Sequence, residues 1–496
     1  MDRFDYDVIV IGGGLLGCFA LRALTKYKLR AALLEQREDL CTGISRSNTA
    51  VVYSGCDTRP GTLKTELCVA AAKSFGKLCG ELGVRYRNCG SLMVSFSDRG
   101  DKVLERKYSQ GNENGVRDLR LLKPRQVLEM EPMLAENVSS GLYAPDAGTV
   151  NPWELCLAAA ENAEANGGAI ILNSKVTSIK KVKEGFSVLA GGVHYRAGAV
   201  INCAGLFSDS VYELLCKPLV RVIPTRGDYY VLDTKAGNYV NHVVFHEPEE
   251  KGKGLTLVPT TDGNILVGPT EMSAVSKTDF ATDKAGLAEL RRLVSEVMPS
   301  LPMEHVIRSF AALRPNPYYV NKDPKTGAYL PDGKGISSFT VLETPGFISL
   351  VGIKTPGMTC AAGLGELAAV KTADFLGIRE ENKDCNPVRP KPLRLAELSD
   401  EERISAAKRD PAYGRIVCRC CRISEGEVID AVKAGAVTAD GVKRRAGTGM
   451  GRCQGGFCTE KVIEIIAREL GIKPWEVTKD GTGSPILYGR MRSEDV

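Results

Sequence analysis

The feature that most constrains the fold is a β-α-β pattern at the start of the chain, between Asp7 and Glu35. Four apolar residues at 8–11 predict a buried strand, and apolar spacing over about 15–27 predicts a helix. A second short apolar run at 31–34 predicts a strand parallel to the first. The chain therefore starts a fold in which helices cover a parallel sheet.

A glycine-rich turn joins the first strand to the helix, with Gly12, Gly14 and Gly17 in the spacing G-x-G-x-x-G. Such glycines allow a tight turn, the approach of a pyrophosphate, and close helix packing, while the helix N-terminus attracts the anion. Glu35 ends the second strand, 23 residues after Gly12, where it can accept hydrogen bonds from a ribose. The pattern predicts a dinucleotide site, with a purely structural turn as the alternative, and it does not choose between FAD and NAD.

Sequence patterns in the rest of the chain predict a further group of strands and helices and a separate antiparallel sheet. Apolar runs predict strands at 199–203 and 347–351, with helices at about 152–166 and after Gly352 to about 375. Between them, strand patterns at 228–232, 243–245 and 255–258 predict a separate antiparallel sheet, and helical spacing returns at 284–297.

Composition excludes several classes of protein. The 496 residues include 65 Lys+Arg and 60 Asp+Glu, so the net charge of +5 does not favour nucleic-acid binding. No apolar run approaches the roughly 20 residues of a membrane span, and the acidic N-terminus does not resemble a targeting signal. We expect a cytoplasmic protein without a transmembrane segment, for which peripheral membrane association stays open.

The cysteines divide into two groups. Eleven of the 16 are scattered singly in apolar contexts, as buried small side chains are. The other five crowd near the C-terminus, which indicates metal or redox chemistry: Cys418, Cys420, Cys421, Cys453 and Cys458. Residues 380–410 contain Pro387, Pro390 and Pro392 among polar residues and have the composition of a linker. Residues 411–496 are therefore predicted to form a separate module.

Several segments resemble the D-amino-acid-oxidase-like flavoprotein superfamily, and within it the branch of glycerol-3-phosphate and 2-hydroxyglutarate dehydrogenases. The matching segments are 43–55, 200–205, 268–270, 312–315 and 352–359. The resemblance covers roughly residues 5–375 and implies FAD as the cofactor. It also implies an α/β fold, with a Rossmann-like FAD-binding domain and an inserted antiparallel-sheet substrate domain. The C-terminal cysteines, which resemble a different family described below, add a small, mainly α iron–sulfur module to this expected fold.

The same resemblance gives boundaries and cofactor contacts. The oxidoreductase is expected at 1–379, with FAD-binding segments at about 5–90, 150–215 and 340–379 and the substrate sheet at about 90–150 and 216–340. The expected FAD contacts are Gly12, Gly14, Leu15, Leu16, Gly17, Glu35, Gln36, Ser45, Ser47, Asn48, Thr49, Val176, Ala204, Gly205, Gly352, Ile353, Lys354, Gly357, Met358 and Thr359.

The catalytic candidates also follow from the resemblance. Arg314 is similar to the superfamily's anion-binding arginine, and Lys354 and Arg226 are further cationic candidates. Many relatives carry a histidine where this chain has Tyr53, so His246 is named as the replacement base. Structural ion pairs for the cations and an exposed turn position for His246 are the alternatives.

The C-terminal cysteines resemble the bacterioferritin-associated-ferredoxin-like module that binds a 2Fe-2S cluster. Cys418 and Cys420 precede 32 intervening residues, then Cys453 and Cys458, and four thiolates suit a 2Fe-2S centre. Zinc is the alternative, although its ribbons usually use C-x-x-C spacing. Basic residues near the motif would offset cluster charge or attract an acidic electron carrier, unless they are only a solvated face: Arg415, Arg419, Arg422, Lys443, Arg444, Arg445 and Arg452.

A hydride-accepting flavin and a one-electron cluster together indicate a dehydrogenase that passes electrons to a partner subunit or carrier. The first hypothesis is FAD-dependent oxidation of sn-glycerol 3-phosphate, a small anionic hydroxy substrate, to dihydroxyacetone phosphate. The alternative substrates are L-2-hydroxyglutarate, another 2-hydroxy acid or an amino acid. A non-catalytic flavin scaffold with a regulatory module is the third hypothesis, and the intact nucleotide-binding pattern argues against it.

Overall fold

The computed structural model of the protein describes residues 4–247 and 254–489. Its internal contacts divide the chain into two compact units. The large unit comprises Met1–Gln36 and Leu40–Pro390, and the small unit comprises Arg37–Asp39 and Lys391–Val496. The division after Pro390 falls inside the segment 380–410 that was predicted as a linker.

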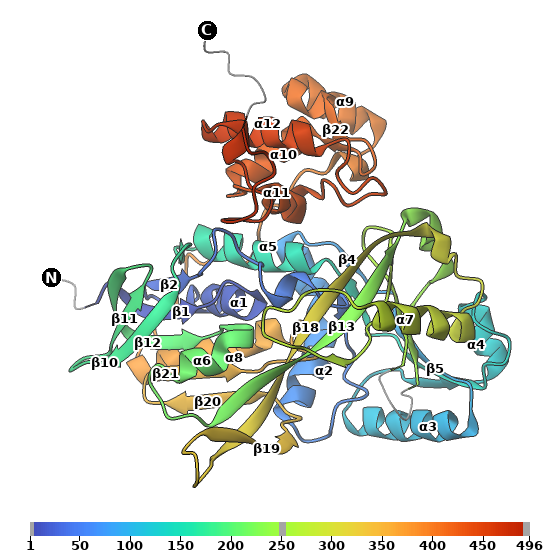
Figure 1. Ribbon diagram of the computed structural model, residues 1–496, viewed down its shortest axis with the longest axis horizontal. Helices are drawn as coiled ribbons and strands as arrows, with labels where there is room; N and C mark the ends of the chain where they lie inside the picture. Colours follow the sequence, from blue (N-terminus) through green and yellow to red (C-terminus); the bar gives the residue numbers. More distant parts are fainter. Residues whose placement is uncertain (1–3, 248–253, 490–496) are drawn as a thin grey trace. The chain divides into compact units, whose positions relative to one another are not determined.

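The large unit contains a mixed sheet with a parallel centre (Figure 1). Strands β9, β2, β1, β12 and β21 lie side by side and run in one direction, and β10, β11 and β20 add antiparallel edges. Their bounds are β1 Tyr6–Ile11, β2 Ala31–Leu34, β9 Ala169–Ile171, β10 Val176–Lys181, β11 Phe186–Ala190, β12 Val193–Asn202, β20 Thr340–Thr344 and β21 Phe347–Val351. The turns after β1, β2, β12 and β21 meet at one edge, where open α/β sheets bind ligands.

An apolar core packs on each face of this sheet. Both cores include residues of β1, because successive side chains of a strand point to opposite faces. Val8 and Val10 contribute to a core with α1 Leu15–Leu24, α2 Leu63–Leu82, α5 Pro152–Ala165 and α8 Ala361–Leu376. Ile9 and Ile11 contribute to the core of the other face, with residues of β10–β12 and α6 Ser208–Tyr212. Burial on both faces explains why β1 is a continuous apolar run.

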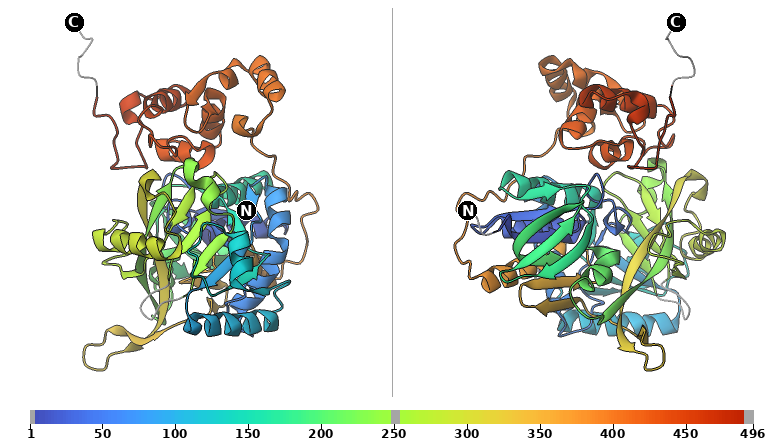
Figure 2. Two further views of the ribbon diagram at one scale, coloured as in Figure 1. Left: turned by 90° about the vertical axis from the view of Figure 1, so that its right-hand side faces the viewer. Right: turned by 60° about the vertical axis from the view of Figure 1, so that its left-hand side comes forward.

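The second sheet of the large unit has the strand order β19-β18-β13-β16-β15-β14-β5-β7-β6, with β17 beside β13. Its bounds are β5 Ser91–Ser95, β6 Arg120–Leu122, β7 Ser140–Ala144, β13 Val220–Leu232, β14 Val243–His246, β15 Thr256–Pro259, β16 Ile265–Val267, β17 Met272–Ser273, β18 Val306–Lys322 and β19 Tyr329–Gly335. Both views in Figure 2 show that the ribbon of β18 and β19 projects from the rest of this unit. The predicted antiparallel sheet is confirmed, except that β14 and β5 pair in parallel. More than a hundred residues separate these two strands, so no hairpin fixes their direction.

The two faces of this second sheet have different neighbours. One face packs Val244, Leu257 and Ile265 in a core with residues of α7 Lys284–Val297. The other face carries Phe245 and Phe310, which join Tyr53 in a separate cluster. A small sheet of β3 Val51–Val52, β8 Gly148–Val150 and β4 Tyr86–Arg87, together with α3 Asp98–Glu113 and α4 Pro124–Met130, completes the large unit.

The small unit is mainly helical. Its elements are α9 Asp400–Arg409, β22 Ile416–Cys418, β23 Ile423–Ser424, α10 Glu425–Lys433, α11 Ala439–Ala446 and α12 Thr459–Leu470. A capping box begins α10, because Ser424 Oγ accepts from the Glu427 N–H and Glu427 Oε2 accepts from the Ser424 N–H. Val428, Val442 and Ile466 lie in its core.

The predicted linker is partly ordered. Arg389 donates its backbone N–H to the Glu81 carbonyl at 2.8 Å and its Nε to Glu161 Oε2 at 2.6 Å, so residues up to Pro390 belong to the large unit. Residues 400–409 form α9 of the small unit. Between these two parts, Leu395–Glu397 form a single 3₁₀ turn. Among the described residues, none of the helices is both long and apolar enough to cross a lipid bilayer.

Candidate functional site

The glycine turn lies at the carboxyl edge of the parallel sheet. Gly12 has φ of 106°, and a Cβ there would lie 2.7 Å from the Cys203 carbonyl oxygen of the neighbouring strand. A Cβ at Gly17 would lie 1.9 Å from the Gly12 carbonyl oxygen. A Cβ at Gly14 would lie 2.9 Å from Ser45 Oγ. The turn thus provides close approach without side chains, which is the geometry that a pyrophosphate requires.

Glu35 is buried at the end of β2, where its Oε2 accepts the Gly13 N–H at 2.6 Å. This bond fixes the carboxylate beside the glycine turn, at the place where a ribose hydroxyl is expected. Gln36, the next residue, is exposed. Glu35 is therefore held beside the glycine turn, whereas the side chain of Gln36, the other residue predicted at this position, points to solvent.

The segment 43–55 folds over the start of α1. Ser45 Oγ accepts the Leu15 N–H at 3.0 Å, and Asn48 donates to the Ser45 carbonyl while its Oδ1 accepts the Ala50 N–H. Ser47 Oγ is buried and has no hydrogen-bond partner among the described residues. Asn48 therefore shapes the segment, and the Ser47 hydroxyl is a buried polar group suited to an oxygen of a bound cofactor.

The turn after β21 contains the predicted contacts at 352–359. Gly352 has φ of 60°, its N–H donates to Ser208 Oγ at 3.2 Å, and a Cβ there would lie 2.7 Å from Pro317. Thr359 Oγ1 accepts the Tyr53 N–H at 3.1 Å, so this turn is joined to the segment 43–55. Ile353 is buried in the core below the turn, and α8 begins at Ala361.

The structure also gives the positions of the other predicted cofactor residues. The Ala204 N–H donates to Asn202 Oδ1 at 3.1 Å, and Gly205 has φ of 58°, so both lie in the turn after β12. Val176 begins β10 and packs against the core of the second face. Leu16 and Met358 pack against the core of the first face.

Three cationic side chains gather beside this edge, on the face of the second sheet that carries Phe310. Arg314 lies on β18, and its Nη1 is 3.1 Å from Glu271 Oε1. Lys354 Nζ donates to Asn316 Oδ1 at 3.3 Å. Arg314 and Asn316 are two residues apart on one strand and therefore share a face. We call Lys64, Arg314 and Lys354 the cation cluster.

The charges of the cation cluster act on each other. Burial lowers the pKa of Lys354, nearby Lys64 and Arg314 lower it further, and Glu271 opposes the shift. Burial also lowers the pKa of Lys64, whose Nζ donates to the Ser337 carbonyl at 2.5 Å and lies 5.2 Å from the centre of the Phe339 ring. Positive charge is thus concentrated where water is partly excluded, and an anion placed there would relieve the repulsion.

Two tyrosines border the cation cluster. Tyr53 stacks on Phe245 with ring centres 5.9 Å apart, and Tyr229 stacks on Phe310 at 4.7 Å. Burial raises the pKa of both phenols, and the charge of Arg314 opposes the shift in each case. Both tyrosines are therefore neutral hydrogen-bond donors at physiological pH.

His246 points to the other face of the second sheet. Its neighbour Phe245 faces Tyr53, so the alternation of β14 turns the imidazole away from the cation cluster. The ring lies 5.6 Å from Phe96, which packs on the α7 side of the sheet. The structure brings Arg314, Lys354 and Tyr53 together but does not bring His246 to them. Arg226, the further cationic candidate, lies 3.1 Å from Asp279 and 3.9 Å from Asp283, which are structural partners.

The four predicted cluster ligands form two pairs of thiols. Cys420 Sγ is 3.6 Å from Cys453 Sγ, and Cys418 Sγ is within hydrogen-bonding reach of Cys458 and also of Cys421. Two thiolate pairs are the arrangement in which each iron of a 2Fe-2S centre takes two sulfur ligands. Among the described residues, no three Cys, His or acidic groups converge on one point as a single zinc ion would require.

Backbone N–H groups point at these sulfurs. Gly449 donates to Cys418 and Cys458, and Gly455 and Phe457 donate to Cys453. Such bonds stabilise the negative charge of cluster sulfurs. Cys458 is the N-cap residue of α12, and no side-chain hydrogen bond caps that helix. The small unit therefore fits a 2Fe-2S cluster in its sulfur pairing and in its amide donors.

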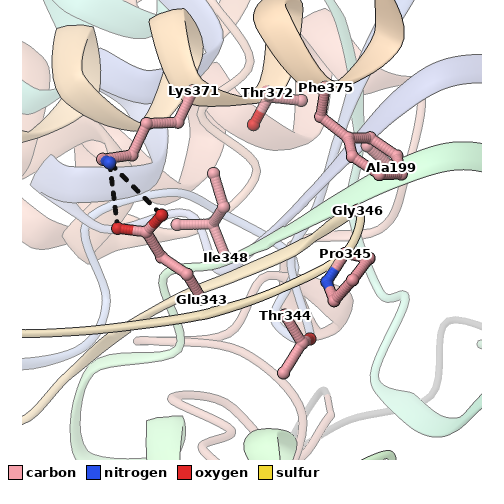
Figure 3. A pocket seen from close by; sticks show the side chains of 9 residues that line it. All are labelled: Ala199, Glu343, Thr344, Pro345, Gly346, Ile348, Lys371, Thr372 and Phe375. Atoms are coloured by element: carbon pink, nitrogen blue, oxygen red, sulfur yellow. Dashed lines mark hydrogen bonds and ion pairs between the residues drawn. The ribbon is translucent and has the colours of Figure 1, made fainter.

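A separate cavity of about 300 Å³ lies at the opposite end of β21 (Figure 3). Lys371 Nζ forms an ion pair with Glu343 at 3.0 Å beside it. The lining residues are Ala199, Glu343, Thr344, Pro345, Gly346, Ile348, Lys371, Thr372 and Phe375. None of these residues belongs to the glycine turn or to the cation cluster, so this cavity is not the candidate site.

Comparison with known families gives the same assignment as the geometry. The family described as "FAD dependent oxidoreductase" matches residues 7–370. The chain belongs to this family. A second family, described as "BFD-like [2Fe-2S] binding domain", matches residues 416–468 of this FAD dependent oxidoreductase. The enzyme therefore uses FAD and a 2Fe-2S cluster, and the zinc alternative is set aside.

Individual relatives of this oxidoreductase cover most of its length. It is 38% identical over 491 residues to the glycerol 3-phosphate dehydrogenase of Caloramator mitchellensis, covering 99% of both chains. It is 28% identical over 410 residues to the L-2-hydroxyglutarate dehydrogenase of Escherichia coli, covering 75% of this chain and 94% of the relative. The solved structure of the L-α-glycerophosphate oxidase of Mycoplasma pneumoniae with FAD bound aligns with a TM-score of 0.69 at 25% identity, over 78% of this chain and 99% of that chain.

Lys64, Glu271, Asn316 and Tyr229 were not among the site residues predicted from the sequence. Each comes from a different element or turn, and they meet only through the pairing of distant strands and the packing of α2. Asn316 alone carried a local signal, since it lies two residues after Arg314 in a strand pattern.

Proposed function

We propose that the enzyme oxidises sn-glycerol 3-phosphate to dihydroxyacetone phosphate and passes the electrons through its 2Fe-2S cluster to a partner carrier. The observation that carries this proposal is the cation cluster, in which the charges of Lys64 and Arg314 act on Lys354 and Glu271 lies 3.1 Å from Arg314. A phosphate dianion is better matched to several cations than a neutral alcohol is. The names of the Caloramator and Mycoplasma relatives support the same substrate.

Arg314 and Lys64 are proposed to hold the phosphate. The planar guanidinium of Arg314 can form two parallel hydrogen bonds with phosphate oxygens. Glu271 occupies Arg314 in the described structure and would have to give way to the substrate. Lys64 adds a second positive charge from α2.

Lys354 is proposed to accept the hydroxyl proton. When bound, FAD accepts a hydride from the carbon that carries the hydroxyl group. The proton left on the oxygen needs a base, and the lowered pKa of Lys354 increases the neutral fraction of its amine. Asn316 Oδ1 orients this amine by accepting a hydrogen bond from it. Tyr53 would donate to the substrate oxygen and exclude water together with Phe245.

His246 stays a prediction as the base. Its orientation toward Phe96 favours Lys354 for this role, and the two assignments make opposite predictions for variants, which are given in the Discussion.

The iron–sulfur module is proposed to be the exit for electrons, because a cluster transfers one electron at a time while the flavin receives two with the hydride. We assign residues 1–379 to the oxidoreductase and 411–496 to the module, and we divide the segment 380–410 between the two units after Pro390. We place the enzyme in the cytoplasm, since all sixteen cysteines are free thiols, which suits a reducing compartment.

L-2-hydroxyglutarate is the second candidate substrate. The fork of Arg314 suits a carboxylate as well as a phosphate, and the relative from Escherichia coli supports this alternative. The two substrates should differ in how strongly they depend on Lys64, because glycerol 3-phosphate concentrates two negative charges on one group whereas 2-hydroxyglutarate divides them between two carboxylates.

Anaerobic mixing with each substrate tests the proposal. We expect glycerol 3-phosphate to bleach the flavin absorbance and then that of the cluster, while glycerol and L-2-hydroxyglutarate leave both unchanged. Lys64→Met should raise the KM for glycerol 3-phosphate about 10-fold, because a buried charge pair is lost. Lys73→Met, on the exposed side of the same helix, should leave KM unchanged. Bleaching by L-2-hydroxyglutarate alone would replace the first candidate with the second.

A further inference from the structure

The two thiol pairs of the small unit differ in their exposure. Cys418 and Cys458 are buried at 1% and 2% exposure, whereas Cys420 is exposed and Cys453 is partly exposed. A cluster held by all four sulfurs would thus have one inner side and one outer side. The outer side, at Cys420 and Cys453, is the shorter route for an electron that leaves toward solvent.

An exposed aromatic residue lies in the loop that carries the outer ligand Cys453. Phe457 lies between the ligands Cys453 and Cys458, and its side chain is 81% exposed. Its backbone N–H donates to Cys453, so its main chain serves the cluster while its ring contributes little to the core. An exposed aromatic ring of this kind is typical of the centre of a protein–protein interface.

The same loops carry only positive charge. Residues 418–422 and 447–458 contain Arg419, Arg422 and Arg452 and no acidic residue. All three arginines are exposed, and Arg419 and Arg422 form no ion pair with any residue in the described part of the chain. The nearby Glu425 does not neutralise them, because it already pairs with Arg415 at 2.6 Å and Arg468 at 2.8 Å.

Other basic residues of the module are used internally. Arg444 is 4% exposed and pairs with Asp480 at 2.9 Å, and Arg445 donates to the Ala434 carbonyl at 3.0 Å. Arg419 and Arg422, in contrast, leave their charge at the surface of the ligand loops. We call Arg419, Arg422, Arg452 and Phe457 the cluster rim.

We propose that the cluster rim is the docking site for an acidic one-electron carrier protein. The arginines would attract carboxylates of the carrier, and Phe457 would pack at the centre of the contact, next to the exposed Cys420 ligand. Opposite charges would speed the encounter and orient the carrier's redox centre toward the outer thiol pair. This inference rests on the proposed electron exit and specifies its partner and contact residues.

A simpler explanation assigns the arginines only to the negative charge of the cluster. In that case their removal would shift the reduction potential and would not change the affinity for a carrier. Measuring the reduction potential of the cluster and the affinity for the carrier in the same variants therefore distinguishes the two explanations.

The test uses plant-type ferredoxin as the probe, since it is an acidic carrier with a potential of about −400 mV. Reduced ferredoxin is mixed anaerobically with the full-length protein containing oxidised cluster, and the rate of cluster reduction is followed by absorbance. This reaction needs no substrate, so it can succeed even if glycerol 3-phosphate is not oxidised. Binding of oxidised ferredoxin is measured separately by calorimetry.

We expect Arg419→Gln/Arg422→Gln to lower the second-order rate constant about 10-fold at low salt and to weaken its dependence on salt. Phe457→Ala should raise the dissociation constant about 10-fold. Iron content and reduction potential should stay at the wild-type values. The control Lys408→Gln/Lys433→Gln removes two exposed charges from the module outside the ligand loops and should change nothing.

Equal rates and equal dissociation constants in wild type and rim variants would overturn the proposal. A shift in potential with unchanged ferredoxin binding would also overturn it, because the arginines would then serve the cluster alone.

Discussion

At the scale of single residues, the site combines cations with a carboxylate that competes for one of them. Glu271 lies 3.1 Å from Arg314, and burial raises its pKa. The pair holds Arg314 in place before substrate arrives. If the substrate anion binds Arg314 as proposed, it must displace this carboxylate, which imposes a cost on binding.

Replacing Glu271 with Gln should therefore strengthen substrate binding. We expect KM for glycerol 3-phosphate to fall about 3- to 10-fold, because one carboxylate no longer competes for the guanidinium. Steady-state kinetics with an artificial electron acceptor measures this change. The control is Glu289→Gln, which removes a partly exposed acid on α7, away from Arg314, and should leave KM unchanged. An increase in KM would show that Glu271 orients Arg314 rather than competing with the substrate.

The pH dependence distinguishes Lys354 from His246 as the base. A base must be unprotonated, so kcat/KM should rise with pH and level off above the pKa of Lys354, which is lowered from 10.5. Lys354→Arg keeps a positive charge but stays protonated up to a pH of about 12, so kcat should fall about 100-fold or more while KM changes little.

His246→Gln serves as the matched variant, because its ring faces Phe96. We expect it to keep the wild-type pH profile. If His246→Gln instead removes the rise with pH and Lys354→Arg keeps it, the proton goes to His246.

At the scale of elements, the glycine turn is the part of the site that is most sensitive to one added carbon. A Cβ at Gly17, on α1, would lie 1.9 Å from the Gly12 carbonyl oxygen, whereas a Cβ at Gly80, on α2, would meet nothing within 4 Å. Both positions are helical, so the comparison separates close packing from helix propensity.

Gly17→Ala should yield protein with little bound FAD, because α1 and the turn after β1 must move apart. Gly80→Ala should keep full flavin content and be more stable by about 0.5–1 kcal/mol. The flavin-to-protein absorbance ratio and thermal unfolding measure both effects. Full flavin content in Gly17→Ala would mean that the close approach of α1 to the turn is not needed for the cofactor.

Local patterns predicted β1, α1, β2, α7 and β21 well, because each is set by periodicity within its own residues. The placement of Gly12, Glu35 and Gly352 at one edge is not a local pattern, because it depends on the order of the parallel strands. The neighbours of Arg314 could not be predicted, since they come from α2, β13 and the residues before β17. The pattern Val244–Phe245–His246 did show that two neighbours face opposite ways, but only the packed sheet showed which of them faces the site.

At the scale of the whole molecule, the two cofactor sites belong to different compact units. The glycine turn and cation cluster lie within Leu40–Pro390 and Met1–Gln36, and all four predicted cluster ligands lie within Lys391–Val496. Each unit has its own core. Loss of one cofactor should therefore leave the other bound.

Cys453→Ser tests this independence. We expect the variant to lose most of its iron while it keeps its flavin and still shows flavin bleaching by glycerol 3-phosphate. Electron transfer from reduced ferredoxin to the protein should fall about 10-fold or more, because the cluster proposed to accept the electron is missing. Cys216→Ser, at a partly exposed thiol of the large unit, should retain both cofactors. Undiminished electron transfer from ferredoxin in the absence of iron would mean that the carrier exchanges electrons with the flavin directly.

The position of Cys458 at the start of α12 has a consequence for cells short of iron. A helix that begins at a metal ligand is anchored at that end by the metal. Chains made during iron limitation should therefore fray at this helix, while the flavin unit matures normally. Such a chain could still reduce its flavin but would lack the proposed cluster that passes the electrons on. The iron supply would then determine the fraction of enzyme molecules that complete turnover.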